Sequence, residues 1–300
     1  MKYTNVYELP EPVVRAIVND NYSSGSSDYS ITELLAPAKQ KYLERLHEDE
    51  LEQDISDNLI PLFGNAVHML LEKHAEPKAL VEQRFNAPLK LGDATFELSG
   101  AVDHYRADTE TVSDYKTMGV FGVTRDSFGD WTVTDPNKIR QIQAYAWLLE
   151  ANGHPVTTLE LVCFFKDWSL ARTHIPNYPP TAILPVSVTK LGKEDVETFL
   201  KERVIAHETA RSGHPLDCTA EERWADPPTY AVKKHGHRNA IKGGSKFTSY
   251  DAAQDYIDTY FLDPDDHYID KRETGARKCK NYCPVNTFCH QYMEELNNGR

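Results

Sequence analysis

Helical and strand patterns alternate along the first two thirds of the chain. Apolar residues spaced three and four positions apart predict a helix over 59–75. A second helix is predicted over 136–152, because a proline stands at its start and a glycine directly follows its end. Two further helical stretches are expected over 31–46, with a break at Pro37, and over 193–211.

Short runs rich in β-branched and aromatic residues lie between these helices and predict strands. The expected strands are 81–89, 94–105, 111–117, 157–166, 170–176 and 183–189. The acidic segment 47–57 fits a solvated helix face or a loop, and 119–135 fits a loop. In this order, the elements predict an α/β core with a central mixed sheet flanked by helices.

The chain is expected to have three parts. Residues 1–29 are predicted to be a flexible N-terminal segment, since they end in the Ser- and Gly-rich run 23–27. Residues 30–212 carry the predicted core elements. Residues 213–300 differ in composition and hold all but one of the 5 cysteines, so they are expected to form a C-terminal extension packed on the core.

Length and charge limit the possible classes of protein. A chain of 300 residues with 40% hydrophobic and 26% charged residues can form a full core. Its first residues lack the apolar stretch of a signal peptide, and no apolar run approaches the roughly 20 residues that span a bilayer. We therefore expect a cytoplasmic protein with no membrane partner. The net charge of -13 argues against a general nucleic-acid coat protein, but it allows an enzyme with a local basic strip.

The segment 98–118, LSGAVDHYRADTETVSDYKTM, predicts a tight β-hairpin. Its polar turn, ADTE, is centred so that Asp103 lies directly opposite Asp114. Like charges at opposite positions destabilise a sheet, so this pair requires a cation or a shared proton. Lys116 lies two residues after Asp114 and points to the same face. Two acids and a lysine on one face suit a divalent-metal site that hydrolyses a phosphodiester, although they also fit a surface hairpin with an ordinary ion pair.

Two further groups of residues accompany the hairpin in sequence order. His68 lies in the predicted helix 59–75, four residues after Gly64. Gln141 and Tyr145 are spaced to share one face of the helix 136–152. Each group alone also fits an ordinary amphipathic helix.

As an ordered set, these motifs resemble the RecB-like branch of the PD-(D/E)xK nuclease superfamily. The motifs are Gly64-x-x-x-His68, Gly100-x-x-Asp103, Asp114-Tyr-Lys116 and Gln141-x-x-x-Tyr145. The resemblance spans about residues 30–190 and implies a restriction-endonuclease-like core. It also implies a metal-dependent deoxyribonuclease, an exonuclease on DNA ends or single strands, in recombination, repair, replication or phage DNA metabolism. For a phage-encoded protein the location would be the host cytosol.

The resemblance also implies roles for individual residues. The expected ligands of Mg²⁺ or Mn²⁺ are His68, Asp103, Asp114 and the backbone carbonyl of Tyr115. Hard divalent ions prefer oxygen ligands, and the imidazole favours Mn²⁺ over Mg²⁺. Lys116 is expected to position the attacking water or to offset charge in the transition state. Gln141 and Tyr145 are expected to hold the lysine or to touch the DNA backbone.

The cysteines indicate a second metal site in the extension. The candidate ligands are Cys218, Cys279, Cys283 and Cys289, whereas Cys163 lies in an apolar run and fits a buried core residue. Clustered cysteines in a reducing cytosol favour metal over disulfides. Several RecB-like nucleases resemble this chain in closing their C-terminal segment with a 4Fe-4S cluster, although their late spacing is C-x2-C-x5-C and their distant cysteine precedes the core. Structural Zn²⁺ held by four thiolates fits as well, and so do unrelated buried thiols.

A basic strip lies between Asp226 and Asp251, where the chain has no acidic residue. The candidate DNA contacts in this strip are Lys233, Lys234, Arg238, Lys242 and Lys246. The cysteine site could hold the strip beside DNA, but the same residues also fit a solvated loop.

Two other functions fit the sequence. One is a non-catalytic DNA-binding or scaffold subunit that retains a nuclease fold stapled by zinc or an iron–sulfur cluster, although the intact Asp-Asp-Lys set argues against it. The other is a zinc-binding interaction module on an unrelated α/β domain, which leaves the order of the motifs to chance. Because the chain lacks helicase motifs, a helicase or recombination protein is the expected partner for any unwinding.

Overall fold

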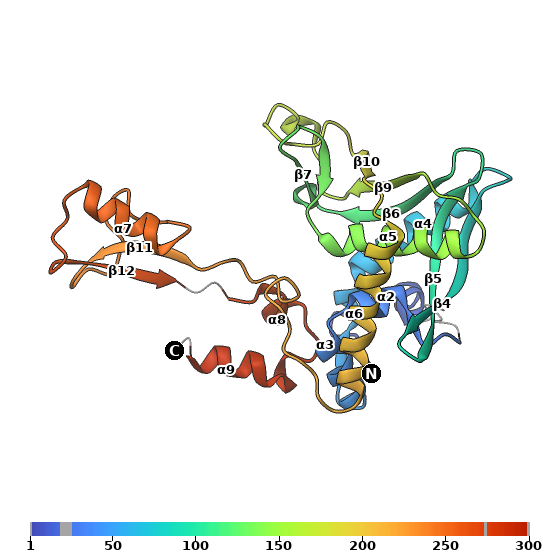
Figure 1. Cartoon of the computed structure of the whole chain (residues 1–300), viewed down its shortest axis with the longest axis horizontal. Coiled ribbons are helices and arrows are strands. Elements are labelled where there is room, and N and C mark those ends of the chain that lie inside the picture. The colour runs from blue at the N-terminus through green and yellow to red at the C-terminus, as the bar shows by residue number, and fades with distance from the viewer. Residues whose placement is uncertain (1, 19–25, 273–274, 299–300) are drawn as a thin grey trace. The chain divides into compact units, whose positions relative to one another are not determined.

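The computed structural model describes residues 2–18, 26–272 and 275–298. The chain forms two compact units, Met1–Leu216 and Asp217–Arg300 (Figure 1). The boundary falls a few residues after the one expected between core and extension, and each unit has its own hydrophobic core. In the described parts of the chain, no helix has both the length and the apolar composition needed to cross a membrane.

The first unit is built around a mixed sheet. Its strands are β2 (Tyr29–Ser30), β4 (Leu80–Leu91), β5 (Ala94–Arg106), β6 (Thr111–Met118), β9 (Thr158–Phe165) and β10 (Ile183–Val188). They run in the order β10-β9-β6-β5-β2, and β4 also pairs with β5. Pairing is parallel between β6 and β9 and between β2 and β5, and antiparallel in the other pairs. The predicted central mixed sheet is therefore confirmed.

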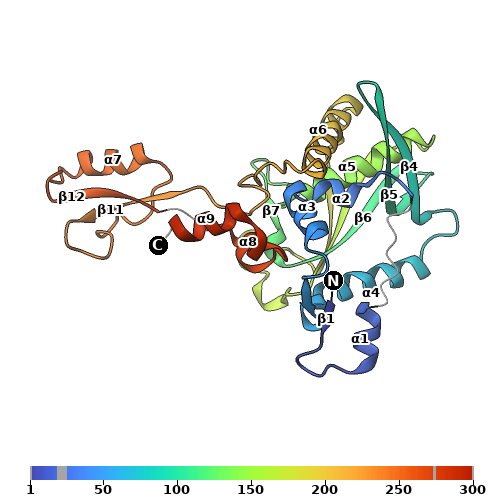
Figure 2. The same cartoon turned by 90° about the horizontal axis from the view of Figure 1, so that it is seen from below.

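Helices flank this sheet, as predicted. They are α2 (Ile31–Leu35), α3 (Ala38–Leu46), α4 (Leu59–Lys73), α5 (Pro136–Ala151) and α6 (Lys193–Arg211). In Figure 2 the strands run between α5 and α4. Every residue from Ile142 to Leu149 is buried, because α5 packs both on the sheet and against α2 and α6. The core between α5 and the sheet includes the fully buried Leu98, Val102, Leu148 and Leu161.

The N-terminal segment that was expected to be flexible contains regular structure. This segment contains β1 (Lys2–Thr4) and α1 (Glu11–Val18), and β3 (Glu52–Asp54) follows later in the chain. β1 pairs in parallel with β3, which lies in the acidic segment. Asp54 joins the two strands, because its carboxylate accepts hydrogen bonds from Thr4 Oγ1 (2.9 Å) and from the Val6 backbone N (2.8 Å). Residues 23–25 of the Ser- and Gly-rich run lie outside the described residues.

Some short segments also differ from expectation. The elements there are η1 (Ile55–Asn58), η2 (Val120–Gly122), β7 (Val123–Arg125), β8 (Trp131–Val133) and η3 (Leu170–Arg172). β7 and β8 form a small antiparallel hairpin inside the expected loop 119–135, with the guanidinium of Arg125 over the ring of Trp131. The predicted strand over 170–176 is wrong. A 3-10 turn occupies its start, and Pro176 at its end cannot donate to a strand ladder.

The second unit contains a small α/β module followed by short helices. Its elements are β11 (Thr229–Lys234), α7 (Tyr250–Thr259), β12 (His267–Arg272), α8 (Arg277–Asn281), η4 (Asn286–Phe288) and α9 (His290–Asn298). β11 and β12 pair antiparallel, and α7 packs on them over Val232, Ala253 and Ile257 (Figure 1). The module is therefore inserted between Cys218 and the three late cysteines.

Candidate active site

The hairpin of β5 and β6 has the register that its turn predicts. His104–Arg106 of β5 pair with Thr111–Ser113 of β6, and the same register places Asp103 opposite Asp114. The ladder stops before this pair. Asp103 bridges the gap, because its Oδ2 accepts a hydrogen bond of 2.7 Å from the backbone N of Tyr115. The two acids therefore lie where the strands begin to separate.

A third acid, Glu82, extends this row on β4. The register of β4 against β5 places Glu82 opposite Asp103, but the ladder omits this one pair. Glu82 has a left-handed backbone, with φ of 47°. A residue other than glycine in this conformation costs about 1–3 kcal/mol, and such residues cluster at functional sites. Three adjacent strands thus bring Glu82, Asp103 and Asp114 into one row.

Strand β5 is buried on both faces around this interruption. Leu98, Ser99, Val102 and Tyr105 are fully buried, Asp103 is 6% exposed and His104 is 7% exposed. Because side chains alternate along a strand, consecutive buried residues mean that both faces are covered. Gly100 lies against Tyr145 and Leu148 of α5. The acids therefore lie in a part of the sheet that is shielded from solvent on both sides.

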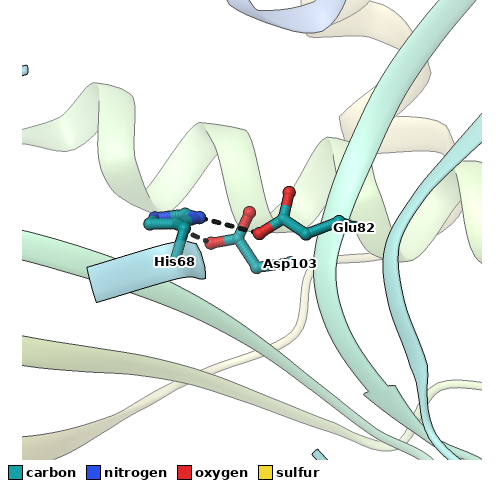
Figure 3. A group of neighbouring side chains, drawn as sticks. All are labelled: His68, Glu82 and Asp103. Carbon is teal, nitrogen blue, oxygen red and sulfur yellow. Dashed lines mark hydrogen bonds and ion pairs between the residues drawn. The ribbon is translucent and has the colours of Figure 1, made fainter. Parts of the chain in front are cut away.

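His68 approaches the acids from α4 (Figure 3). Its Nδ1 lies 2.9 Å from Glu82 Oε1, and its Nε2 lies 3.2 Å from the Tyr115 carbonyl oxygen and 3.7 Å from Asp103 Oδ2. Burial opposes protonation of the ring, but Glu82 and Asp103 outweigh it and raise the pKa of His68. Both ring nitrogens face oxygen acceptors, so the ring needs a second proton or a cation at Nε2.

Lys116 and Asp114 form a buried ion pair beside Asp103. Lys116 Nζ lies 2.6 Å from Asp114 Oδ2, and Asp114 is fully buried. Apart from this ion pair, neither carboxylate oxygen of Asp114 has a hydrogen-bond partner among the described residues. Burial and the charge of Asp114 raise the pKa of Asp103 to about 7. Burial opposes the charge on Lys116, but the two acids outweigh it and raise its pKa as well.

Gln141 and Tyr145 meet on α5, as their spacing predicts. Gln141 Nε2 donates a hydrogen bond of 2.7 Å to the Tyr145 hydroxyl. Burial, followed by the charges of Asp114 and Asp103, raises the pKa of Tyr145, so its hydroxyl stays protonated within electrostatic range of both acids. Gly100 makes room for the ring, because a Cβ at that position would lie 2.8 Å from Tyr145 Cε1.

The geometry of the row fits a hard divalent cation. The donor atoms are carboxylate oxygens, a backbone carbonyl and one imidazole, which suit Mg²⁺ or Mn²⁺. Within the described chain, His68, Glu82 and Asp103 form a group whose ligand atoms all lie within 4.8 Å of one another. The oxygens of Asp114 and the raised pKa of Asp103 both indicate a place for added positive charge.

Glu82 was missed in the sequence, although the same counting could have found it. The turn Gly92-Asp93 joins β4 to β5, and Leu91 pairs with Ala94 across it. Counting outward from this turn places Glu82 opposite Asp103. The sequence alone does not reveal the left-handed backbone that brings Glu82 to His68, because glutamate has no special preference for it.

The four predicted cysteines all lie in the second unit. Burial, followed by the neighbouring thiols of Cys283 and Cys289, raises the pKa of Cys279 to about 11. Cys218 joins this segment through the amide of Gln291, which makes two hydrogen bonds of 2.9 Å with the Cys218 backbone. Four thiolates on one zinc ion lie about 3.8 Å apart. In the described chain, the cysteines do not form a group with all sulfurs within 4.8 Å. Cys163 is fully buried in β9.

The structure places acids beside part of the basic strip. Lys233 Nζ lies 2.6 Å from Asp270 Oδ2, and Lys234 Nζ lies 3.2 Å from Asp266 Oδ2. The sequence could not show this, because both acids follow α7 in the chain and come near the strip only when β12 pairs with β11. The exposed members of the strip are Arg238, Lys242 and Lys246. A DNA contact by this strip stays a prediction.

Comparison with known proteins gives remote similarities. No family model matches the chain, and no curated protein matches it. Among solved structures, the chain is similar to SSO0001, with 16% identity and a TM-score of 0.44 over 64% of this chain and 83% of that one. It is also similar to a phage-related exonuclease from Haemophilus somnus 129PT, with 13% identity and a TM-score of 0.27 over 58% of this chain and 71% of that one.

Proposed function

We propose that this protein is a metal-dependent deoxyribonuclease of the RecB-like PD-(D/E)xK type, an exonuclease acting on DNA ends or single strands. The observation that carries the proposal is the row of Glu82, Asp103 and Asp114 on three adjacent strands, with Lys116 and His68 beside it. Such a row has more negative charge than one lysine balances. A divalent cation and a phosphate-facing lysine resolve this imbalance and supply the parts of a hydrolytic site.

The acids and the imidazole would hold the cation. Asp103, Asp114 and the carbonyl of Tyr115 offer oxygen ligands, and His68 offers Nε2. A bound Mg²⁺ or Mn²⁺ polarises the phosphodiester and lowers the pKa of a bound water. Glu82 fixes the imidazole through Nδ1, as outer carboxylates do for metal-binding histidines.

Lys116 and the tyrosine on α5 would act on the substrate. The two acids keep Lys116 protonated, so it can offset charge that develops on the phosphate or orient the attacking water. Tyr145 stays protonated and can donate a hydrogen bond toward the same region. Gln141 holds the tyrosine hydroxyl, which makes it a positioning residue.

We further propose that the four cysteines hold a 4Fe-4S cluster. The support for this choice is the resemblance to RecB-like nucleases, in which three late cysteines and one distant cysteine bind such a cluster. The role is structural, joining the chain end to the segment at Cys218. Expected partners are DNA and a helicase or recombination protein. Iron and zinc analysis of the purified protein tests the choice, and one equivalent of zinc without iron would reverse it.

The nuclease proposal is tested with end-labelled DNA. Single- and double-stranded oligonucleotides labelled at the 5′ or 3′ end are incubated with the protein in Mg²⁺, Mn²⁺ or EDTA. We expect cleavage that requires the metal and that is lost in Asp114→Asn. Comparing the products of 5′-labelled and 3′-labelled substrates gives the direction in which the strand is cleaved.

The matched control is Asp108→Asn, the same change in the exposed turn of the same hairpin. It should keep wild-type activity, because Asp108 lies at the opposite end of the β5–β6 ladder from the acidic row. Cleavage by Asp114→Asn at the wild-type rate, or undiminished cleavage in EDTA, would contradict the proposal.

A further inference from the structure

Two exposed aromatic side chains lie in contact beside the cysteines of the second unit. The rings of Trp224 and Tyr282 are 5.2 Å apart between centroids and inclined by 59°. Trp224 is 43% exposed and Tyr282 is 67% exposed. Single exposed apolar residues are common, but a solvent-facing pair that includes tryptophan is typical of a binding surface.

The position of Trp224 is fixed by the surrounding chain. Its backbone is left-handed, with φ of 52°, which costs a residue other than glycine energy that the surrounding structure must supply. The preceding residue, Arg223, donates to Glu295 at 2.7 Å, and its carbonyl accepts from the backbone N of Lys278 at 3.1 Å. Glu295 also accepts from the backbone N of Ala276 at 3.2 Å. These contacts hold the segment of Trp224 against the segment of Tyr282.

A lysine side chain lies over one ring of the aromatic pair. Lys278 Nζ lies 5.8 Å from the centroid of the Trp224 ring. Lys280 is exposed and has no ion pair among the described residues, whereas Arg277 is paired with Asp226 at 3.5 Å. Lys278 therefore lies beside the Trp224 ring, and Lys280 adds a second, exposed charge in the same short helix. Such a cation at an aromatic face is stabilised there and leaves its other side to solvent.

We infer that Trp224, Tyr282, Lys278 and Lys280 form a platform that binds single-stranded DNA by base stacking. Exposed rings stack on bases of any sequence, and flanking lysines contact the backbone. A duplex offers little to such rings, because its bases are already stacked on one another. A neutral protein ligand would gain nothing from the lysines. The inference rests on the proposed function, since it names the strand form that the nuclease would take.

The test measures binding by the full-length chain carrying Asp114→Asn, so that DNA is not cleaved. The probes are fluorescein-labelled dT20 and a 20-base-pair duplex, followed by anisotropy. Loss of one stacked base weakens binding roughly 5- to 150-fold, so Trp224→Ala and Tyr282→Ala should each weaken dT20 binding by this factor. Duplex binding should change less than twofold. Trp224→Phe keeps a ring and should restore most of the affinity.

A second readout separates stacking from a folding defect. The chain has 4 tryptophans, and a base stacked on Trp224 should quench part of their fluorescence. Tyr282→Ala should reduce this quenching, and Trp224→Phe should remove it while dT20 still binds. Phe261→Ala is the control, because Phe261 is an aromatic residue of the same unit that is 93% exposed. It should bind dT20 like the parent.

Several results would overturn the inference. One is unchanged dT20 affinity in a Trp224→Ala/Tyr282→Ala double variant whose thermal transition matches the parent. Equal loss of duplex and single-strand binding would point to a general structural effect and reject stacking. Cleavage by the wild type together with an unaffected double variant would reject the platform alone. Stacking-dependent dT20 binding without any cleavage by the wild type would reject the nuclease alone.

Discussion

In both units a lysine on a strand faces an aspartate, but the pKa of the aspartate is raised in the first unit and lowered in the second. In the first unit, Lys116 faces Asp103 and Asp114 in a buried row, and burial and like charge raise the pKa of Asp103 to about 7. In the second unit, Lys233 lies 2.6 Å from Asp270, which Arg272 also contacts at 3.4 Å, and the hydrogen bond from Lys233 followed by that from Arg272 lowers the pKa of this acid. The residue types are the same. The ratio of acids to cations and the burial of the acids distinguish an ordinary ion pair from a grouping with unbalanced negative charge.

The two ion pairs should differ most when each lysine loses its charge, both in activity and in the free energy of unfolding. Lys116→Met should reduce the proposed nuclease activity by at least about 10³-fold, because it removes the charge that we propose faces the phosphate. It should also lower the free energy of unfolding by about 3–5 kcal/mol, since two buried acids lose their cation. Lys233→Met leaves Asp270, whose side chain is 27% exposed and keeps Arg272 as a partner, and should cost about 1 kcal/mol or less. Cleavage assays and urea unfolding measure both effects.

Adding Asp114→Asn separates the two parts of the Lys116→Met effect. The double variant should regain most of the lost stability, because one uncompensated acid is removed, but it should stay inactive. If the double variant is as unstable as Lys116→Met alone, the destabilisation does not come from facing charges, and the comparison with Lys233 loses its basis.

The two aspartates should also give opposite pH dependence of stability. Folded Asp103 keeps its proton up to about pH 7, whereas the unfolded carboxyl releases it near 3.8. The folded protein therefore binds more protons in this interval, and its free energy of unfolding in EDTA should fall as pH rises from 4 to 7. Asp270 works in the other direction, because its lowered pKa adds stability that is lost as pH falls below about 4.

Thermal unfolding between pH 4 and 8 measures this dependence. Asp103→Asn should flatten the loss between pH 4 and 7, and Mn²⁺ should stabilise the wild type more at pH 7.5 than at pH 5. Asp270→Asn should leave both features intact. A wild-type protein that is equally stable at pH 5 and 7.5 in EDTA, with no response to Asp103→Asn, would contradict the assigned burial of like charges.

Two glycines test the packing behind the acidic row. Gly100→Ala places a Cβ 2.8 Å from Tyr145 Cε1 and 2.9 Å from Leu148 Cδ1, so the tyrosine must move. Overpacking of this kind costs about 1–3 kcal/mol, and displacement of Tyr145 should reduce the cleavage rate roughly tenfold. Gly64→Ala on α4 meets Thr117 Oγ1 at an ordinary 3.6 Å. It should keep activity and gain up to about 1 kcal/mol of helix stability. Equal effects of the two changes would contradict this account.

Local pattern predicted much of the first unit but little of the second. The register of Asp103 and Asp114 follows from a short turn, because pairing in a hairpin is fixed by counting from its centre. Pro37 and Pro136 likewise mark helix boundaries that the structure shares. Counting from the β4–β5 turn also places Glu82 opposite Asp103, but its approach to His68 depends on a left-handed backbone. Sequence pattern does not encode such strain.

The second unit depends on contacts between distant segments. Asp266 and Asp270 approach the basic strip only once β12 has paired with β11. Gln291 meets Cys218, and Trp224 meets Tyr282, across the whole inserted module. No periodicity links such residues. The clustering of cysteines in the sequence indicated candidate ligands, but nothing in the sequence indicated the aromatic pair. The DNA-contact prediction for the strip therefore has to be tested residue by residue.

The smallest effects are expected within the strip itself. Lys233→Gln and Lys234→Gln remove charges that Asp270 and Asp266 already balance, so affinity for dT20 and its dependence on salt should barely change. Arg238→Gln and Lys242→Gln remove exposed charges. If these residues contact phosphates, each change should reduce the slope of log affinity against log salt by about 0.7. Binding titrations across several salt concentrations measure the slopes. A larger loss of dT20 affinity from Lys233→Gln and Lys234→Gln than from Arg238→Gln and Lys242→Gln would mean that DNA binding breaks the two ion pairs. The contrast between Lys233 and Lys116 would then be one of degree.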